Sequence, residues 1–488
     1  MRKFSKIIML ALVALMAFSC VAMATEAPEP YKVKATQYLT SKGWDPNVKK
    51  VINQMFDAFG RNSKNYNPEC RPYAVFDCDN TISLTDVEEQ RLIFQEENLR
   101  YAIKPSEMYN VLVTGIPDVK LNCGKDYANA TIEALAKDVA AAYAKLYKKG
   151  YVAPDASKAG LKAKWMADDD WKEFATKIRL MYDAIGDNMS VSISYPWVGY
   201  HFTGMTPAQA EQLAYDSHKF YTEFGQKDPK NWTKGKWESP MNYKSIVGPV
   251  SVSFRLSTGV SAEMRELIKK LDANGIDVWI NSASPVATIR GLHRYWQLDG
   301  VRDIVAMTYK IKNGVYTNEY DYDLHAQTQG VGKSETVAKI IAPLYNGHGP
   351  IFGAGDSQGD FNFMTEFKDT VCGIMINRQR KDDAGICAAI AMYQNEKGID
   401  LYKAMEKGEI RFVLQGRQEN GGYFWDQPGT QLLGKDKVGI LHEKAQKWLE
   451  MLQKGTTPNE LLNQCTKLTG KLKTYKGTKS RELSKVVF

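Results

Sequence analysis

The chain has few of the residues that build zinc sites or dense disulfide frameworks. It contains seven cysteines and six histidines in 488 residues, with no Cys-x-x-Cys motif and no histidines at zinc-ligand spacing. The formal net charge of +8 is mild for this length. We therefore expect neither a zinc site nor a nucleic-acid partner.

Long apolar runs are confined to the amino end of the sequence. Three basic residues precede an apolar run over 7–17, and the small residues at 22–24 are of the kind that signal peptidase reads. We expect a signal peptide over 1–24 and a secreted, periplasmic protein. A lipid anchor at Cys20 is the alternative, which the bulky Phe18 disfavours. No other run approaches the ~18 apolar residues of a membrane-spanning helix.

Cysteines in an oxidising compartment can form disulfides. Cys372 and Cys387 are the nearest candidates in sequence, and pairing among these, Cys70, Cys123 and Cys465 stays open. Cys78 lies between two acids and is interpreted as a packed thiol.

The most informative stretch is YAVFDCDNT over 73–81, in which a predicted buried strand runs into Asp77 and Asp79. Alternation along an extended chain directs both acids to one side, where they repel unless a cation lies between them. Mg²⁺ prefers such oxygen ligands. One carboxylate can then attack phosphorus while the other transfers protons. An Asp-rich strand end that only caps the next helix is the simpler interpretation.

The sequence from this motif to residue 248 predicts helices. Segments 128–146 and 207–224 have strong helix propensity, and 227–248 has the Lys, Asn, Pro and Gly content of a linker. Thr85 is expected to cap the first helix with its hydroxyl. Apolar spacing predicts a further helix within 31–65, before the motif.

Aromatic residues are frequent in the helical region, among them Trp165 and Trp197, with acids at 168–170 beside the first of them. Rings near carboxylates can bind a quaternary ammonium through cation–π attraction. Packing in a helical core explains the same rings, and both interpretations stay open.

Three later element ends also carry polar groups. The predicted strand 277–280 runs into Asn-Ser-Ala-Ser with Ser282, and the predicted strand 350–354 runs into Asp356 and Asp360. Lys333 begins a predicted helix, where a cation opposes the helix dipole unless an anion is bound. Ligands of open parallel sheets collect at the carboxyl ends of strands, so we expect these groups to converge with Asp77.

Together these motifs resemble phosphatases of the haloacid dehalogenase superfamily, over about 71–84 and 248–377. The DxDNT form of the first motif, the Ser-Ala-Ser after the second strand, the helical insertion and the secretion signal are most similar to secreted phosphorylcholine phosphatases, and more distantly to phosphoserine phosphatases. The resemblance implies an α/β fold, with a Rossmann-like parallel sheet and a large helical cap inserted after the first motif.

The resemblance also implies roles for the matched residues. Asp77 would be the nucleophile that forms an aspartyl-phosphate, and Asp79 the general acid and base. Thr81 would steady their loop. Ser282, with the neighbouring N–H groups at Ala283, would bind the phosphoryl oxygens.

Lys333 would bind the phosphoryl group as well and offset its charge. Mg²⁺ is expected between Asp77, the backbone carbonyl of Asp79 and Asp356, with Asp360 supporting the metal or Lys333. No cap residue matches the choline-binding groups of the family. Trp165 and Trp197 are predicted as substrate contacts from their aromatic character alone.

The expected organisation has five parts. They are a signal peptide (1–24), an amino-terminal helical extension (25–70), an α/β core (71–84 and 249–400), a helical cap with its return linker (85–248), and a carboxyl-terminal extension with a basic tail (401–488). Within the extension, 411–434 is predicted as a strand and turn that pack on the core.

The expected function is Mg²⁺-dependent hydrolysis of a small-molecule phosphomonoester, with phosphorylcholine or a related amino-alcohol phosphate as substrate. A broad-specificity acid phosphatase of the envelope and a non-catalytic envelope protein that binds choline or phosphate are the alternatives. Asp79 disfavours a dehalogenase, because carbon–halogen cleavage leaves no alcohol to protonate. Oligomeric state cannot be read from the sequence.

Overall fold

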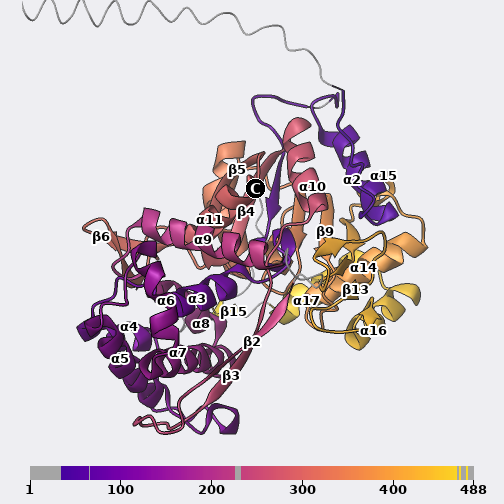
Figure 1. Cartoon of the computed structure of the whole chain (residues 1–488). Coiled ribbons are helices and arrows are strands. Elements are labelled where there is room, and N and C mark those ends of the chain that lie inside the picture. Colours follow the sequence, from indigo (N-terminus) through magenta and orange to yellow (C-terminus); the bar gives the residue numbers. More distant parts are fainter. Residues whose placement is uncertain (1–34, 65, 226–231, 470–471, 474–479, 482–488) are drawn as a thin grey trace, which may run out of the picture. The chain divides into compact units, whose positions relative to one another are not determined.

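The computed structural model describes residues 35–64, 66–225, 232–469, 472–473 and 480–481 (Figure 1). The chain divides into two compact units, Met1–Thr36 and Gln37–Phe488. The predicted signal peptide with Cys20 lies outside the described residues, as does most of the basic tail. The elements below belong to the second unit.

A six-stranded sheet with the order β10-β9-β8-β1-β4-β5 organises the second unit, and all of its pairs are parallel. Its strands are β1 (Tyr73–Phe76), β4 (Asp277–Pro285), β5 (Val301–Met307), β8 (Phe352–Gly355), β9 (Cys372–Ile376) and β10 (Arg411–Gln415). The chain runs outward from β1 to β5 and then returns to β8 on the other side. The strand order therefore reverses between β1 and β8, where doubly wound sheets bind ligands.

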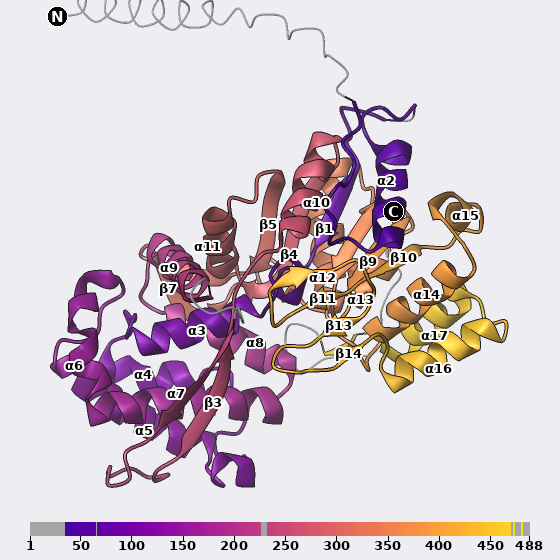
Figure 2. The same cartoon turned by 45° about the vertical axis from the view of Figure 1, so that its right-hand side comes forward.

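Alternate residues of β1 face two apolar layers, as the pleat requires. Ala74 and Phe76 pack with one layer, and Tyr73 and Val75 with the other. The first layer contains α2 (Pro46–Phe59), α10 (Ala262–Ala273) and α11 (Val286–Trp296). The second contains η5 (Val337–Ile341), α13 (Phe361–Thr365), α14 (Ala384–Glu396), α16 (Glu443–Gln453) and α17 (Pro458–Thr469), the last three being adjacent in Figure 2.

Helix α2 is shorter than the helical region predicted over 31–65. Asp45 caps it by accepting hydrogen bonds from the backbone N–H groups of Asn47 and Val48, and Pro46 occupies the first turn. The described residues before it, 35–45, are not helical. Proline fixes the start of the helix because it lacks an N–H but suits the first turn.

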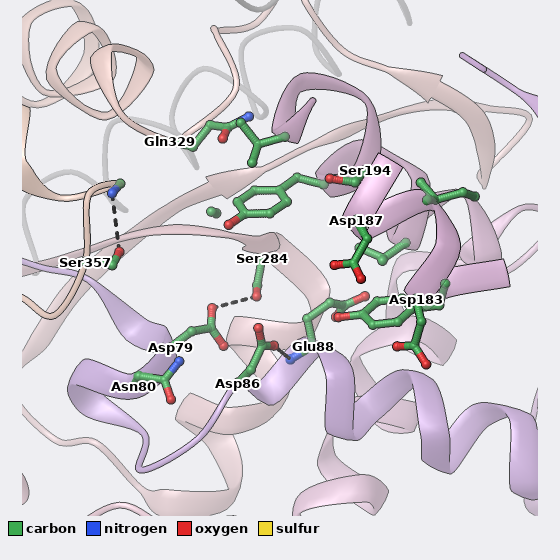
Figure 3. Close-up of a pocket in the computed structure, with 18 of the residues that line it drawn as sticks. Asp79, Asn80, Asp86, Glu88, Asp183, Asp187, Ser194, Ser284, Gln329 and Ser357 are labelled. Atoms are coloured by element: carbon green, nitrogen blue, oxygen red, sulfur yellow. Dashed lines mark hydrogen bonds between the residues drawn. The ribbon is translucent and has the colours of Figure 1, made fainter. Parts of the chain in front are cut away.

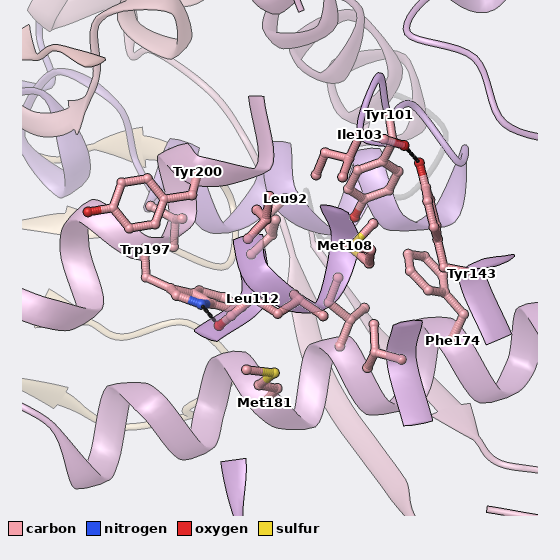
Figure 4. Close-up of a cluster of buried hydrophobic side chains, with 14 of the residues drawn as sticks. Leu92, Tyr101, Ile103, Met108, Leu112, Tyr143, Phe174, Met181, Trp197 and Tyr200 are labelled. Atoms are coloured by element: carbon pink, nitrogen blue, oxygen red, sulfur yellow. Dashed lines mark hydrogen bonds between the residues drawn. The ribbon is translucent and has the colours of Figure 1, made fainter. Parts of the chain in front are cut away.

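The helical cap predicted after the first motif is present. It contains α3 (Val87–Glu97), α4 (Pro105–Val113), α5 (Ile132–Lys148), α6 (Lys162–Met166), α7 (Asp169–Asn188), α8 (Val191–Gly199) and α9 (Pro207–Gly225). These helices share an apolar core of their own, part of which is drawn in Figure 4. The predicted fold class, an α/β parallel sheet with a helical cap, is confirmed.

The segment expected as a return linker contains a strand. β2 (Thr233–Glu238) pairs antiparallel with β3 (Ser251–Leu256), and Val252 and Phe254 of β3 bury their side chains in the cap core. A hairpin follows β5, formed by β6 (Tyr309–Lys312) and β7 (Val315–Tyr320). Its turn residues Asn313 and Gly314 both have positive φ, the geometry that Asn-Gly favours.

The carboxyl-terminal extension contributes to the sheet. Strand β10 lies within the predicted strand and turn over 411–434, and pairs with β9 at the sheet edge. A small sheet of β11 (Arg417–Gln418), β12 (Tyr423–Phe424), β13 (Thr430–Gln431) and β14 (Val438–Gly439) follows it.

Cys70, Cys78, Cys123 and Cys372 are free thiols. A disulfide between Cys372 and Cys387 is therefore not formed. Cys78 is fully buried, as expected for a packed thiol, and the side chain of Cys465 lies outside the described part. Among the residues that the structure describes, no helix has the length and apolar character needed to cross a membrane.

Candidate active site

Asp77 is the first residue after β1, and two groups hold its carboxylate. Lys333 Nζ lies 2.5 Å from Asp77 Oδ1 and 2.6 Å from Asp360 Oδ1. The Thr81 hydroxyl donates to Asp77 Oδ2 at 2.9 Å. The structure thus brings together four of the predicted site residues, two of them 256 positions apart.

Burial has the largest influence on the ionisation of this group of charges. It raises the pKa of Asp77 well above the usual range, and Asp360 raises it further while Lys333 opposes both. Burial also pulls down the pKa of Lys333, but Asp360 and Asp77 outweigh it, so the pKa of the amine is raised. Lys333 therefore remains protonated at neutral pH.

Asp356 and Asp360 follow β8, the strand beside β1 at the reversal point. Asp360 Oδ2 accepts the backbone N–H groups of Asp356 at 3.1 Å and Ser357 at 3.0 Å, which fixes its orientation. The approach of Asp360 also requires glycine at 355, since a Cβ there would lie 2.5 Å from Asp360 Cβ.

One carboxylate oxygen from each of Asp77, Asp356 and Asp360 lies within 4.8 Å of the others. All three acids are buried, and burial raises the pKa of Asp356 to about 6 although Arg378 lowers it. Three carboxylates that repel one another suit a divalent cation, because the cation relieves the repulsion and accepts oxygen ligands. The cluster is therefore a candidate metal site.

Asp79 is held by hydroxyl and backbone donors. Ser284 Oγ donates to Asp79 Oδ2 at 2.7 Å and Ser282 Oγ at 3.3 Å, while the N–H of Val87 donates to Oδ1 at 2.7 Å. Burial raises the pKa of Asp79, and the hydrogen bonds from Ser284 and Val87 lower it. A carboxyl group with a raised pKa is suited to donate a proton.

Ser284, which sequence reasoning did not single out, makes the shorter of the two serine hydrogen bonds. It lies two positions after Ser282 on β4, so alternation along the strand directs both hydroxyls to the same side. The alternation of side chains along this strand is the sequence feature from which Ser284 could have been predicted.

The cap begins beside Asp79. Helix α3 is capped by Asp86, which accepts the N–H groups of Glu88 and Glu89, and the predicted cap by the Thr85 hydroxyl is wrong. That hydroxyl donates instead to the carbonyl of Ser257, on the chain returning from the cap. A carboxylate caps a helix as well as a hydroxyl does, and it favours the dipole more.

A cavity of about 890 Å³ lies over these groups (Figure 3). Its core side includes Asp77, Asp79, Ala283, Ser284, Lys333, Asp356 and Asp360, and its cap side includes Asp86, Glu88, Asp183, Asp187, Tyr182, Tyr195 and Trp197. In Figure 3, Asp183 and Asp187 project from the cap across from Asp79. The volume is that of a small-molecule site.

The two predicted tryptophans have different positions. Trp197 lines the cavity, and its indole N–H donates to the carbonyl of Leu112 at 2.7 Å (Figure 4). Trp165 is not among the cavity-lining residues, and its indole N–H donates to the carbonyl of Glu97 at 3.1 Å within the cap. Both rings are 1% exposed.

Charged residues that follow β9 and β10 were also missed. Arg378 lines the cavity and its Nη1 lies 3.3 Å from Asp356 Oδ2. Arg417 donates to the carbonyl of Asn80. Both arginines come shortly after strands of the parallel sheet, so the strand-end rule that identified Asp77 and Asp356 applies to them equally.

No protein-family model matches the chain, and no curated protein matches its sequence. A solved structure described as a conserved, functionally unknown protein from Anaerococcus prevotii DSM 20548 is similar over 81% of this chain and 98% of its own, with a TM-score of 0.66 and 22% identity. A HAD family hydrolase from Salmonella enterica subsp. enterica serovar Typhi matches 62% of each chain at 11% identity, with a TM-score of 0.29.

A phosphoserine phosphatase solved as a phospho-aspartyl intermediate analogue matches 62% of this chain and 86% of its own at 11% identity, with a TM-score of 0.25. TM-scores of 0.29 and 0.25 support no inference about the function of this chain. The Anaerococcus similarity shows that the fold is shared, and the chemistry must be inferred from the site residues themselves.

Proposed function

We propose that the protein hydrolyses phosphomonoesters, with Asp77 as the nucleophile and Mg²⁺ as the cofactor. The observation that carries this proposal is the contact of Lys333 with both Asp77 and Asp360 at the strand reversal, beside a cavity. This arrangement places a carboxylate nucleophile, Asp77, beside the fixed positive charge of Lys333, which can bind an anionic group.

The proposed reaction has two steps, and each proton transfer and bond change in it is carried out by a named residue. In the first, a carboxylate oxygen of Asp77 attacks phosphorus, the phosphorus–oxygen bond to the leaving alcohol breaks, and the Asp79 carboxyl gives that oxygen its proton. In the second, water attacks the aspartyl-phosphate, Asp79 takes a proton from the water, and inorganic phosphate leaves Asp77 restored. Lys333 offsets the negative charge of the phosphoryl oxygens in both steps.

Asp77, Asp356 and Asp360 would hold Mg²⁺, together with the backbone carbonyl of Asp79. When bound, this ion neutralises phosphoryl charge and aligns the group for in-line attack. Ser282 and Ala283 are proposed to bind the remaining phosphoryl oxygens from the end of β4. Of the two, Ala283 lines the cavity, whereas Ser282 is buried and its hydroxyl donates to Asp79.

For the substrate we favour phosphorylcholine or another small amino-alcohol phosphate. The cap side of the cavity supports this, since the acids Asp86, Asp183 and Asp187 line it, although Asp183 already pairs with Arg179 at 2.8 Å. The ring of Trp197 can add cation–π attraction. A broad-specificity phosphatase is the second candidate, because about 890 Å³ admits larger esters as well. The envelope location that segment 1–24 indicates remains part of this proposal.

A substrate panel tests the proposal. With Mg²⁺ present we expect phosphate release, with phosphorylcholine and phosphorylethanolamine showing kcat/KM values at least tenfold above those of uncharged alkyl phosphates. Removal of the metal with EDTA should stop release. Equal rates across the panel would support the broad phosphatase, and tight binding of phosphorylcholine without release would support a binding protein.

The two tryptophans provide a matched pair for the substrate contact. Trp197→Phe should lower kcat/KM for phosphorylcholine relative to an aryl phosphate about 2- to 5-fold, because the whole cation–π contact contributes ~0.5–2 kcal/mol and phenylalanine, the weaker partner, keeps part of it. Trp165→Phe removes an equally buried indole away from the cavity and should leave the ratio unchanged. A ratio that does not move in Trp197→Phe would exclude a cation contact at this ring.

A further inference from the structure

A fully buried arginine from the carboxyl-terminal segment reaches the nucleophile loop. Arg417 is 0% exposed, and its Nη1 donates to the carbonyl of Asn80 at 2.7 Å. Its Nε and Nη2 donate to Glu419 Oε1 at 2.9 and 2.6 Å. The guanidinium therefore joins a residue of the small carboxyl-terminal sheet to the loop after β1.

The loop position that Arg417 contacts is a left-handed turn. Asn80 has φ of +59°, a left-handed conformation that asparagine adopts more readily than other non-glycine residues. It lies directly after Asp79, beside which Figure 3 shows it, and directly before Thr81. The Asn80 N–H donates to the carbonyl of Thr85 at 3.2 Å, so Arg417 holds the opposite end of the same residue. The turn at this residue therefore lies next to Asp79, whose carboxylate accepts the Ser284 hydroxyl at 2.7 Å.

Glu419 extends the contact to the other acidic loop. It is 5% exposed, and its Oε2 accepts the N–H of Leu433 at 2.6 Å, which fixes the carboxylate. Arg378 Nε lies 3.6 Å from Glu419 Oε1, and Arg378 Nη1 lies 3.3 Å from Asp356 Oδ2. A continuous series of charged contacts thus runs from the loop after β1 to the loop after β8.

Stability alone gives a weak reason for this arrangement. Burying an ion-paired network costs desolvation free energy, and an apolar replacement of similar volume is often as stable or more so. The contacts end on the two loops that carry Asp79 and Asp356, which points to a role at the site.

We propose that Arg417, Glu419 and Arg378 form a positioning bridge. Arg417 fixes the turn that aims Asp79, and Glu419 orients Arg378 so that it restrains Asp356. Arg417 and Glu419 are buried and are not among the cavity-lining residues, so they act through Asp79 and Arg378. The bridge makes the carboxyl-terminal segment part of the site, and its catalytic meaning rests on the proposed phosphatase function.

Conservative variants of the full chain test the bridge. Glu419→Gln keeps the shape and removes the charge, and Arg417→Lys keeps the charge and loses the paired contact. Each should lower kcat about 10- to 100-fold and weaken Mn²⁺ binding, followed by titration calorimetry, by a similar factor, as loss of outer partners of metal ligands typically does. KM for the phosphate ester should change much less than kcat.

Arg411→Lys is the matched control. Arg411 is a buried arginine of β10, 1% exposed, whose guanidinium bonds to Asn395 and to the carbonyl of Phe412, away from both acidic loops. The Arg411→Lys variant should be less stable than the wild type but should have the same kcat per folded molecule and the same affinity for Mn²⁺. The double variant Arg417→Lys/Glu419→Gln should cost less than the sum of the single changes, because both break one contact.

Two results would contradict different proposals. If the wild type releases phosphate and binds Mn²⁺ while folded bridge variants match it in both, the positioning bridge is wrong and the phosphatase stands. If the wild type binds Mn²⁺ but hydrolyses nothing, the proposed function is wrong, and the change in Mn²⁺ affinity still decides whether the bridge orients Asp356. A wild type that does neither contradicts both.

Discussion

Replacement of Asp77 by asparagine is expected to abolish turnover, by about 10⁴-fold or more, in a protein that stays folded. The neutral amide cannot attack phosphorus, so no aspartyl-phosphate forms. Stability without metal should fall less than in Lys333→Met, because Lys333 keeps its ion pair with Asp360, and because burial and Asp360 raise the pKa of Asp77, so that the fold disfavours its charge. An acid whose pKa is raised by folding weakens the fold as pH increases, and the amide lacks that penalty.

Rapid acid quenching followed by mass spectrometry would detect the phosphoenzyme in the wild type and its absence in the variant. Asp277→Asn is the control. Asp277 is buried at 4% exposure at the amino end of β4, where it pairs with Arg71 and Arg302. That change should lower the free energy of unfolding yet leave turnover per folded molecule intact. Phosphoenzyme in Asp77→Asn would show that another residue is the nucleophile.

Lys333→Met should damage both stability and rate. Removing one partner of a buried ion pair costs about 3–5 kcal/mol, and Lys333 has two partners, Asp77 and Asp360. We also expect kcat to fall about 10²–10³-fold, as on loss of a fixed positive or hydrogen-bonding group at a developing charge. Without Lys333 the acids should be harder to ionise, so the stability of the metal-free variant should fall as pH rises above about 4.

The cap contains a matched control for this variant. Lys177 is also buried, with Nζ 2.7 Å from Asp138 Oδ2 and a second contact to Glu173. Lys177→Met should lose comparable stability in urea unfolding. Mg²⁺ should restore part of the stability of Lys333→Met, because ligand binding to the folded state stabilises it, and none of the stability of Lys177→Met. If Mg²⁺ stabilises the two variants equally, the proposal that the metal binds beside Lys333 is wrong.

The residues at strand ends could be predicted because their signal is local. Asp77, Asp356 and Asp360 each follow a short apolar run that predicts a strand. A parallel sheet brings the carboxyl ends of its strands to one edge, so these acids are expected to lie close together. The bridge residue Arg417 follows such a run too, but no acid or glycine motif marks it. Its function depends on a contact with Asn80, which lies 337 positions away.

The elements that were missed share a dependence on distant partners. The sequence of β2, TKGKWE, has no strong strand propensity and forms a strand because β3 pairs with it. Trp165 and Trp197 are equally aromatic and equally buried, and only the packing of the cap decides which one borders the cavity. Composition near a residue carries no information about such distant neighbours.

The order of the strands has a consequence for how the protein is made. β1 is the first strand of the sheet to leave the ribosome, yet both of its neighbours, β4 and β8, are translated much later. The contact of Asp77 with Lys333 can form only after residue 333 has been synthesised, and the contact of Asn80 with Arg417 only after residue 417. Such non-local pairing makes folding slow. A nascent chain interrupted before residue 417 would carry all four aspartates, Asp77, Asp79, Asp356 and Asp360, and still lack the contact that aims Asp79.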